Sequence, residues 1–394
     1  MIRTIALYSI FTLTLLSSCS KENKHSNKNL AMQDSIKKAN PFAVDFEPNT
    51  PEYVTQQKIY LDTFYKKYFG SDFSGVFLVA KNGEVLYENY SGYAYKEKDI
   101  KIDSNTPIHV ASVSKVLTAT ATLRLIDQKK LTLDQTVQSI LPTFPNNVTT
   151  VKMLLNHRSG LRNYAYIVEE KGNWDKKIPL TNQDVLSILA KANNIQETLP
   201  GKRFQYCNTN YVLLALIIEK ITHQNFEDAL KELILTPLQM DNTFVFKDLT
   251  KQDSVSQSYK GNYKRLAWEY LDQTYGDKNL FTTAQDLLKF DKATYSNAFL
   301  SQDIRTQMFS GYSYERKGTK NYGLGLRMLE FDNGKKYLFH TGWWHGNTAM
   351  YVTLRDEKIT LIAISNKFSK KPYEIKRLAP HYNPEYPFDF KDED

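Results

Sequence analysis

The sequence predicts an α/β (α+β) fold, in which an antiparallel sheet is assembled from N- and C-terminal segments and a helical lobe is inserted between them. Strand-like alternation is confined to the two ends of the chain, and the long stretch between them has the character of helices. With 394 residues, 41% of them hydrophobic, the chain can form one large domain or two lobes. A cleft between sheet and lobe would be the natural ligand site.

The first strands form a hairpin. Residues 74–80 (SGVFLVA) and 84–90 (EVLYENY) flank Asn82 and Gly83. An Asn-Gly pair between two apolar runs is the strongest short hairpin signal, because both residues tolerate the positive φ angles of a tight turn. The folded body is therefore expected to start near residue 55.

The middle of the chain is predicted to be helical. Residues 113–128 contain apolar runs without Gly or Pro, over a length that favours a buried helix. Further helices are expected at 151–155, 211–221 and 226–235, which Pro, Gly and Asn signals separate. The helical lobe would then span about residues 113–280.

Strand-like alternation returns near the C-terminus, at residues 336–339, 349–354 and 359–365. These strands would complete the sheet that the hairpin begins. The last residues, 381–394, mix Pro, aromatic and acidic residues and fit either an ordered wrap or a frayed tail.

The N-terminus has the pattern of a secretory signal: Arg3, an apolar run over residues 5–16 that is too short to span a bilayer, then small residues. Residues 16–19 spell LSSC, which resembles the lipobox of bacterial lipoproteins and implies that Cys19 is lipid-modified; an incidental cysteine is the alternative. The expected boundaries are 1–18 for a lipoprotein signal peptide, 19–51 for a flexible tether, 52–375 for the folded domain and 376–394 for the tail.

Charge and cysteine content exclude several classes of protein. The formal net charge is +8, but the lysines are scattered rather than gathered in a stripe, so nucleic-acid binding is not expected. The 2 cysteines are too few for a fold held together by disulfides. No CxxC, HExxH or HxHxD pattern occurs, so neither a metal nor another cofactor is expected. The expected location is the bacterial cell envelope, with the exported protein anchored to a membrane by lipid and facing the periplasm or the surface.

Ser112 and Lys115 form an SxxK pattern at the start of the long apolar segment. If Ser112 opens a helix there, the three-residue spacing places both side chains on one face. A serine hydroxyl needs a base to become nucleophilic, and a lysine amine can be that base. The pattern alone also fits a helix-capping serine, and residues 35–38 match it too.

Tyr206, Cys207 and Asn208 form a YxN pattern in a loop that leads into an apolar helix, a setting that can project polar groups into a cleft. Residues 87–89 and 295–297 also match YxN, so plain turn residues are the alternative.

His340, Thr341 and Gly342 form HTG at the end of a strand-like run. A glycine there lets a substrate backbone lie close to the strand, and the flanking polar side chains can bind its carboxylate or carbonyl. A hairpin turn with a surface histidine is the alternative.

In combination, SxxK, YxN 94 residues later and HTG 132 residues after Asn208 match the order and spacing of the serine β-lactamase and penicillin-binding-protein superfamily. The segments that flank these motifs resemble the class C-related serine hydrolases of that superfamily. They are TPIHVASVSKVLTA from residue 106, VKMLLNHRSGL from 151 and PGKRFQYCNTNYVLLALIIEKI from 200. The similarity covers about 290 residues, from Ser74 to Asn366.

The resemblance implies a β-lactamase/transpeptidase-like fold and an acyl-enzyme intermediate. Ser112 would be the nucleophile, and Lys115 and Tyr206 would share the acid and base work. Backbone N–H groups of Ser112 and Trp343 would form the oxyanion hole. The positions implied to contact substrate are Asn208, His340, Thr341, Gly342 and Trp343.

Some positions depart from the family pattern. Family β-lactamases usually carry lysine where this chain has His340, and histidine is commoner among the family's peptidases and esterases. Cys207 is expected to point away from the cleft, and His109 to be structural rather than a triad base. Arg158 stands where the family often has threonine and has no explanation in the sequence.

The leading hypothesis is a membrane-anchored serine hydrolase that cleaves an amide or ester bond. Its substrate would be a small molecule or peptide, with D-amino-acid-containing cell-wall material or a small ester favoured over a β-lactam. The alternatives are a β-lactamase, a non-catalytic penicillin-binding sensor that is acylated without turnover, and a structural envelope protein with relic motifs.

Overall fold

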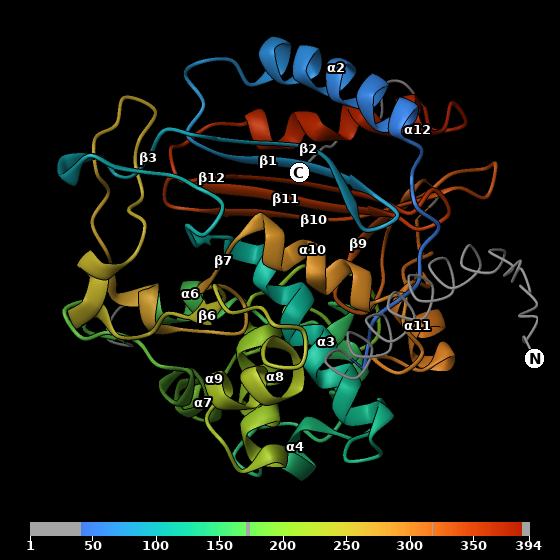
Figure 1. Ribbon diagram of the computed structural model, residues 1–394. Coiled ribbons are helices and arrows are strands. Elements are labelled where there is room, and N and C mark those ends of the chain that lie inside the picture. Colours follow the sequence, from blue (N-terminus) through green and yellow to red (C-terminus); the bar gives the residue numbers. More distant parts are fainter. Residues whose placement is uncertain (1–40, 171–173, 317, 388–394) are drawn as a thin grey trace, which may run out of the picture. The chain divides into compact units, whose positions relative to one another are not determined.

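An antiparallel seven-stranded sheet organises the structure, a computed structural model that describes residues 41–170, 174–316 and 318–387. The strand order is β2-β1-β12-β11-β10-β9-β8, so N-terminal strands pair with C-terminal ones (Figure 1). The predicted fold, a sheet built from both ends of the chain with an inserted helical lobe, is confirmed. The strands are β1 Gly75–Lys81, β2 Glu84–Ser91, β8 Lys320–Tyr322, β9 Arg327–Glu330, β10 Lys336–Trp344, β11 Asn347–Leu354 and β12 Ile359–Ser365.

The hairpin of β1 and β2 turns at Asn82 and Gly83, as predicted. Their φ angles are 51° and 71°, the left-handed conformation that this tight turn requires of both residues. Side chains of β1 then alternate between two cores: Val76 and Leu78 join the core shared with the helical lobe, and Phe77 and others join the core on the opposite face.

Helix α2 (Pro51–Tyr68), which the sequence analysis did not predict, covers that opposite face together with η6 (Lys371–Leu378) and α12 (Ala379–Tyr382) (Figure 1). Thr50 caps α2 by accepting a hydrogen bond from the Tyr53 N–H, and proline occupies its first turn. Its apolar stripe of Leu61, Phe64 and Tyr65 enters the core of this face.

The helical lobe is built around α3 (Ser114–Asp127) and α8 (Thr209–Thr222), which contact each other and are buried on nearly all sides. The predicted segment 226–235 becomes α9 (Phe226–Leu230) continued by one π-helical turn, η3 (Lys231–Leu235). The other helices are α4 Val137–Ile140, α5 Val151–Leu155, α6 Tyr164–Glu169, α7 Asn182–Lys191, α10 Ala284–Ala293, α11 Gln302–Met308 and the short turns η1 Lys96–Lys98, η2 Ala111–Val113, η4 Leu249–Ser254 and η5 Tyr270–Gln273.

Two small sheets support the lobe. Strand β5 (Ile108–His109) pairs with β7 (Leu280–Thr282), which also pairs with β6 (Phe244–Val245), and β3 (Tyr93–Tyr95) pairs with β4 (Ile100–Lys101). Because β5 runs directly into η2, this small sheet anchors the start of α3.

The packed chain extends beyond the boundaries drawn from the sequence. At the N-terminal side, the Phe42 ring packs edge-on against Phe299 with centroids 5.2 Å apart. At the C-terminal side, Tyr386 is buried. The expected signal segment and Cys19 lie outside the described residues. Within them, no helix is long and apolar enough to cross a membrane.

Candidate active site

Ser112 lies in a strained turn at the start of the long helix. It occupies η2, the 3-10 turn before α3, rather than the first α-helical turn. Ala111 has a φ of 48°, a left-handed conformation that costs a non-glycine residue about 1 kcal/mol. The His109 ring holds this turn, because its Nδ1 accepts a hydrogen bond from the Ala111 N–H at 3.1 Å. Burial lowers the pKa of His109 to about 4, so the ring is neutral and structural, as expected.

Lys115 is fully buried on α3, and its Nζ lies 3.0 Å from Ser112 Oγ. The same amine donates a hydrogen bond to the backbone carbonyl of Asp277 at 2.7 Å. With one N–H fixed on that carbonyl, a neutral amine can direct its lone pair at the Ser112 hydroxyl. The structure therefore brings the predicted hydroxyl and base within hydrogen-bond distance.

Tyr206 lies beside this pair. Its ring centroid is 5.1 Å from Lys115 Nζ and 4.8 Å from Arg327 Cζ. Among the hydrogen bonds of the described residues, none joins the Tyr206 hydroxyl to Ser112 or Lys115. Tyr206 thus contributes a polar aromatic group next to Lys115 and Arg327, at the place where a proton must leave Ser112.

His157, to which the sequence analysis gave no role, positions the YxN loop. Its Nδ1 accepts hydrogen bonds from the Cys207 N–H at 3.1 Å and from Asn210 Nδ2 at 3.0 Å, and its ring centroid is 4.4 Å from that of Tyr206. Burial, reinforced by the charge of Lys115, lowers the pKa of His157 well below its usual value, so the ring is neutral. The sequence could have indicated this role, because His157 lies in VKMLLNHRSGL, one of the segments that resemble the family.

Cys207 faces away from the cleft, as expected, and is 1% exposed. Burial raises the pKa of its thiol to about 11, so it stays protonated near neutral pH and is not a nucleophile.

Asn208, at the N-terminus of α8, carries an unsatisfied buried group. Its Oδ1 accepts no hydrogen bond from any described residue. A buried acceptor without a partner costs about 1–3 kcal/mol, so its presence points to a ligand that donates a hydrogen bond. This agrees with the role that the resemblance implies, a contact with a substrate amide N–H.

His340 does not line the exposed edge of β10 as expected, because its side chain is fully buried. Its Nδ1 bonds the Thr341 carbonyl at 2.7 Å and its Nε2 bonds the Tyr322 hydroxyl at 3.1 Å, so the proton belongs on Nδ1 and Nε2 accepts. Burial, strengthened by the charges of Arg327 and Lys115, lowers the pKa of His340 well below its usual value. The ring is neutral and supplies no positive charge to the site.

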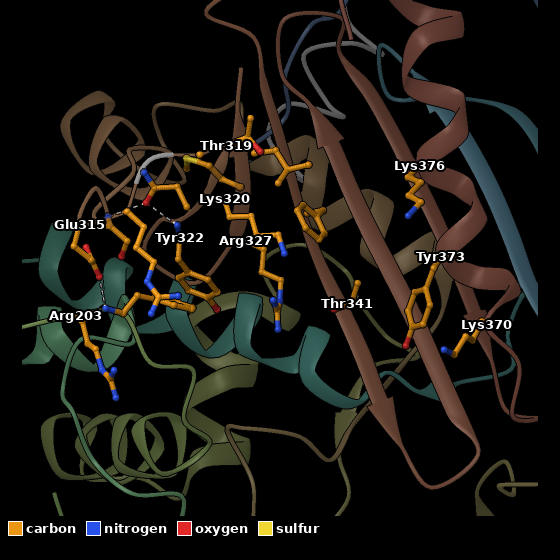
Figure 2. A pocket seen from close by; sticks show the side chains of 18 of the residues that line it. Arg203, Glu315, Thr319, Lys320, Tyr322, Arg327, Thr341, Lys370, Tyr373 and Lys376 are labelled. Atoms are coloured by element: carbon orange, nitrogen blue, oxygen red, sulfur yellow. Dashed lines mark hydrogen bonds between the residues drawn. The ribbon is translucent and has the colours of Figure 1, made fainter. Parts of the chain in front are cut away.

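Arg327 on β9 supplies a cation that sequence reasoning missed. It pairs with Phe339 at the last position of the β9–β10 ladder, and from residue 340 onward β10 has no β9 partner within the described chain. Its Nε is buried and, among the described residues, has no hydrogen-bond partner. Arg327 and Thr341 line the same pocket (Figure 2). A lone arginine in a strand carries no sequence signal.

Gly342 allows β10 to contact the nucleophile turn directly. A Cβ at this position would lie 2.3 Å from the Val110 carbonyl oxygen and 3.2 Å from the Ser112 nitrogen. The Tyr373 hydroxyl donates a hydrogen bond to the Gly342 carbonyl at 2.9 Å and so holds the strand from its other side. This close approach sets the distance between the Ser112 and Trp343 backbones, which are the expected oxyanion donors.

Gly342→Ala is expected to move β10 away from Ser112, because backbone atoms cannot yield to the new methyl group. We expect a destabilisation of about 1–3 kcal/mol from overpacking and a loss of about 10²-fold in turnover from misplaced donors. Gly261→Ala is the matched control, since its nearest neighbour would be 3.6 Å away. Thermal unfolding and esterase rates measure both effects; a fully active Gly342→Ala enzyme would contradict the assigned contact.

The two tryptophans after HTG lie differently. Trp343 is 65% exposed, and its ring centroid is 6.4 Å from that of Phe368, so it can form the expected aromatic wall. Trp344 instead donates a hydrogen bond through Nε1 to Asp272 at 2.6 Å, and His345 Nε2 lies 3.0 Å from the same carboxylate. Although burial alone would raise it, these hydrogen bonds hold the pKa of Asp272 below its usual value.

Arg158, unexplained in the sequence, ties the loop before Tyr206 to the segment over β8. Its guanidinium donates to the Gly201 carbonyl at 2.7 Å and to the Tyr312 carbonyl at 3.0 Å, and pairs with Glu315 at 2.9 Å. It therefore braces one wall of the site.

Lys278 is a second buried lysine near Lys115. It donates a hydrogen bond to the Tyr164 hydroxyl at 2.6 Å and lies 3.4 Å from Asp277 Oδ2. Burial lowers the pKa of Lys278, an effect that the Asp277 carboxylate opposes. This network fixes the residue whose carbonyl receives Lys115. In the part of the chain that the structure describes, no group of three or more His, Cys, Asp or Glu could hold a metal ion.

Comparisons with known proteins agree with this geometry. Residues 67–380 match the profile of the Beta-lactamase family. Penicillin-binding protein 4* of Bacillus subtilis (strain 168) is 30% identical over 334 residues, covering 80% of this chain and 74% of that protein. The D-aminopeptidase of Brucella anthropi is 26% identical over 296 residues, covering 74% of this chain and 56% of that protein. The octameric penicillin-binding protein homologue from Pyrococcus abyssi superposes with a TM-score of 0.69 at 26% identity, covering 83% of this chain and 78% of that one. The chain therefore belongs to the beta-lactamase family and is a serine hydrolase of the penicillin-binding-protein type.

Proposed function

We propose that this protein hydrolyses an amide or ester bond through an acyl-Ser112 intermediate, and that its substrates are peptides containing D-amino acids or small esters rather than β-lactams. The observation that carries this is the 3.0 Å contact between Ser112 Oγ and Lys115 Nζ, beside the unpaired end of β10. The similarity to a D-aminopeptidase supports the substrate class.

Acylation begins when Ser112 Oγ attacks the substrate carbonyl carbon and Lys115 Nζ takes the hydroxyl proton. The carbonyl oxygen becomes an oxyanion, which the backbone N–H groups of Ser112 and Trp343 would stabilise. Lys115 stays in place throughout, because the Asp277 carbonyl holds it.

Collapse of the tetrahedral intermediate breaks the bond to the leaving group. The proton held by Lys115 passes, with Tyr206 as relay, to the leaving nitrogen or oxygen, which departs as an amine or alcohol. Water then attacks the Ser112 ester by the reverse path and releases a carboxylic acid, with the proton returned to Ser112 Oγ. Atoms and charges balance, and the enzyme is restored.

Substrate binding would use the free edge of β10. The Asn208 amide oxygen, buried without a partner among the described residues, can accept a substrate N–H. The Arg327 guanidinium can receive a carboxylate close to the bond that is cleaved, which favours acidic peptide ends. The neutral His340 ring carries no positive charge for such a carboxylate. The positive charge at this place is that of Arg327 on the neighbouring strand β9.

A substrate panel tests the proposal. D-alanine p-nitroanilide, its L-enantiomer, p-nitrophenyl acetate and a chromogenic cephalosporin are compared at equal concentration. We expect the D-amide or the ester to turn over at least about tenfold faster than the cephalosporin, since the similarity to a D-aminopeptidase favours the first class of substrate. Fastest turnover of the cephalosporin would indicate a β-lactamase. A stable adduct without product would indicate a penicillin-binding sensor.

The cell envelope is the proposed place of action. The LSSC sequence ending at Cys19 supports a lipid anchor in a bacterial membrane, with the hydrolase exported and carried on the segment that follows.

A further inference from the structure

We propose that the pocket beside Thr341 contains a second anion subsite, which binds a carboxylate or phosphate group that the substrate carries at a distance from the cleaved bond. Because that anion would belong to the substrate, the assignment rests on the proposed hydrolase function. It goes beyond the carboxylate that Arg327 can receive next to the reaction centre.

The pocket is too large for a single small anion. Its volume is about 780 Å³, within the range of about 300–1,000 Å³ typical of sites for whole small molecules. One side of the pocket carries Arg203, Glu315, Thr319, Lys320, Tyr322 and Arg327. The other side carries Lys370, which precedes η6, and Tyr373 and Lys376 of η6 (Figure 2). Thr341 lies between the two sides, so an extended ligand could pass from β10 to the outer rim.

Positive charge dominates the lining. Both carboxylates there have partners outside the lining: Glu315 pairs with Arg158 at 2.9 Å, and Glu374 pairs with Arg377. The cations that line the pocket are Arg203, Arg316, Lys320, Arg327, Lys370 and Lys376.

The outer cations are available to a ligand. Arg203, Arg316 and Lys370 are exposed and make no side-chain hydrogen bond or ion pair with any described residue. Like charges gathered around a concave surface raise the local concentration of anions. The planar guanidinium of arginine matches both oxygens of a carboxylate or phosphate, and lysine adds a point charge. An oxyanion is therefore the chemistry that this rim recognises.

Two residues that line the pocket adjoin the reaction centre. Arg327 lies beside Tyr206, and Thr341 follows His340 on the strand that approaches Ser112. A substrate with its reacting carbonyl at Ser112 and one carboxylate at Arg327 would have room to place a second anion at Arg316, next to Glu315 on one side of the pocket, or at Lys370 on the other. The favoured substrate is an acyl compound with at least two oxyanions.

Equilibrium binding of anions to a variant that lacks the Ser112 nucleophile tests the subsite separately from hydrolysis. Inorganic phosphate and citrate are titrated calorimetrically into the full chain carrying Ser112→Ala, and then into the same protein with Arg316→Gln and Lys370→Gln. We expect at least one anion to bind, its Kd to rise about tenfold in the rim variant, and its affinity to fall with salt. The tighter anion identifies phosphate or carboxylate as the group recognised.

A matched control removes two exposed charges elsewhere, with Lys130→Gln and Lys191→Gln in the same Ser112→Ala chain. Its Kd should equal that of the parent, and thermal unfolding should show that both variants are folded. Absence of binding by either anion, or an equal effect of the rim and control variants, would overturn the subsite.

Kinetics separate the subsite from the proposed function. Wild-type enzyme is compared on p-nitrophenyl esters whose acyl chains end in a methyl, carboxylate or phosphate group. We expect the anionic ester to have the higher kcat/KM, and the rim variant, in the otherwise wild-type chain, to lose that advantage. Ser112-dependent hydrolysis with no preference for anions would refute the subsite and leave the function intact. Anion binding without any hydrolysis would refute the function and leave an anion site.

Discussion

Ser112→Ala is expected to abolish covalent capture by serine-directed probes. Intact mass spectrometry of the wild-type protein should show one adduct after a fluorophosphonate and, separately, after a penicillin, whereas the variant should show none. Hydrolysis of any substrate should fall by roughly 10³-fold or more, because no other group on α3 can replace the hydroxyl next to Lys115.

Ser114→Ala is the matched control. Ser114 is buried two positions after Ser112. Among the described residues, its hydroxyl makes one hydrogen bond, which it accepts from the Leu280 N–H at 3.2 Å. Its adduct and turnover should persist. An adduct that forms on Ser112→Ala would remove the nucleophile assignment, whereas decay of the wild-type adduct would distinguish a hydrolase from a sensor.

Lys115→Met is expected to slow acylation by about 10²- to 10⁴-fold, the usual contribution of a general base. Methionine fills the volume of a fully buried lysine without placing a charge there, so the fold should survive. Stopped-flow capture of a chromogenic ester measures the rate between about pH 5 and pH 9. The variant should be slower than the wild type throughout that range, because it has no amine to take the Ser112 proton.

Lys191→Met, on the exposed surface of α7, controls for loss of a lysine as such and should keep the wild-type rate. Circular dichroism and thermal unfolding establish that Lys115→Met is folded. An unchanged acylation rate in that variant would show that another group takes the Ser112 proton.

The parts of the fold and site that were predictable depend on short-range patterns. The Asn82-Gly83 turn is dictated by two neighbouring backbone conformations, and the Ser112–Lys115 contact by a three-residue spacing near a helix start. For both, the information lies within a few residues. The strands and helices flanking them were found for the same reason.

The parts that were missed depend on long-range packing. Arg327 can be identified as a site residue only once the fold places it beside Tyr206. Tyr206 lies more than a hundred residues earlier in the chain. Likewise, the buried orientation of His340 is set by the Tyr322 hydroxyl on another strand. Helix α2 was overlooked because it has only a narrow apolar stripe, which becomes informative once the sheet face beneath it is known.

The pairing of β1 with β12 determines when this protein can become active. These strands join the two ends of the domain, and beside them Ser74 Oγ donates to Asn366 Oδ1 across 292 residues. Such distant contacts close late in folding, since a long loop must be ordered before they form. During synthesis, Ser112 emerges long before the strand that carries Gly342, so a partly made chain has a nucleophile but no oxyanion hole. Catalytic competence therefore arrives only with the last tenth or so of the polypeptide.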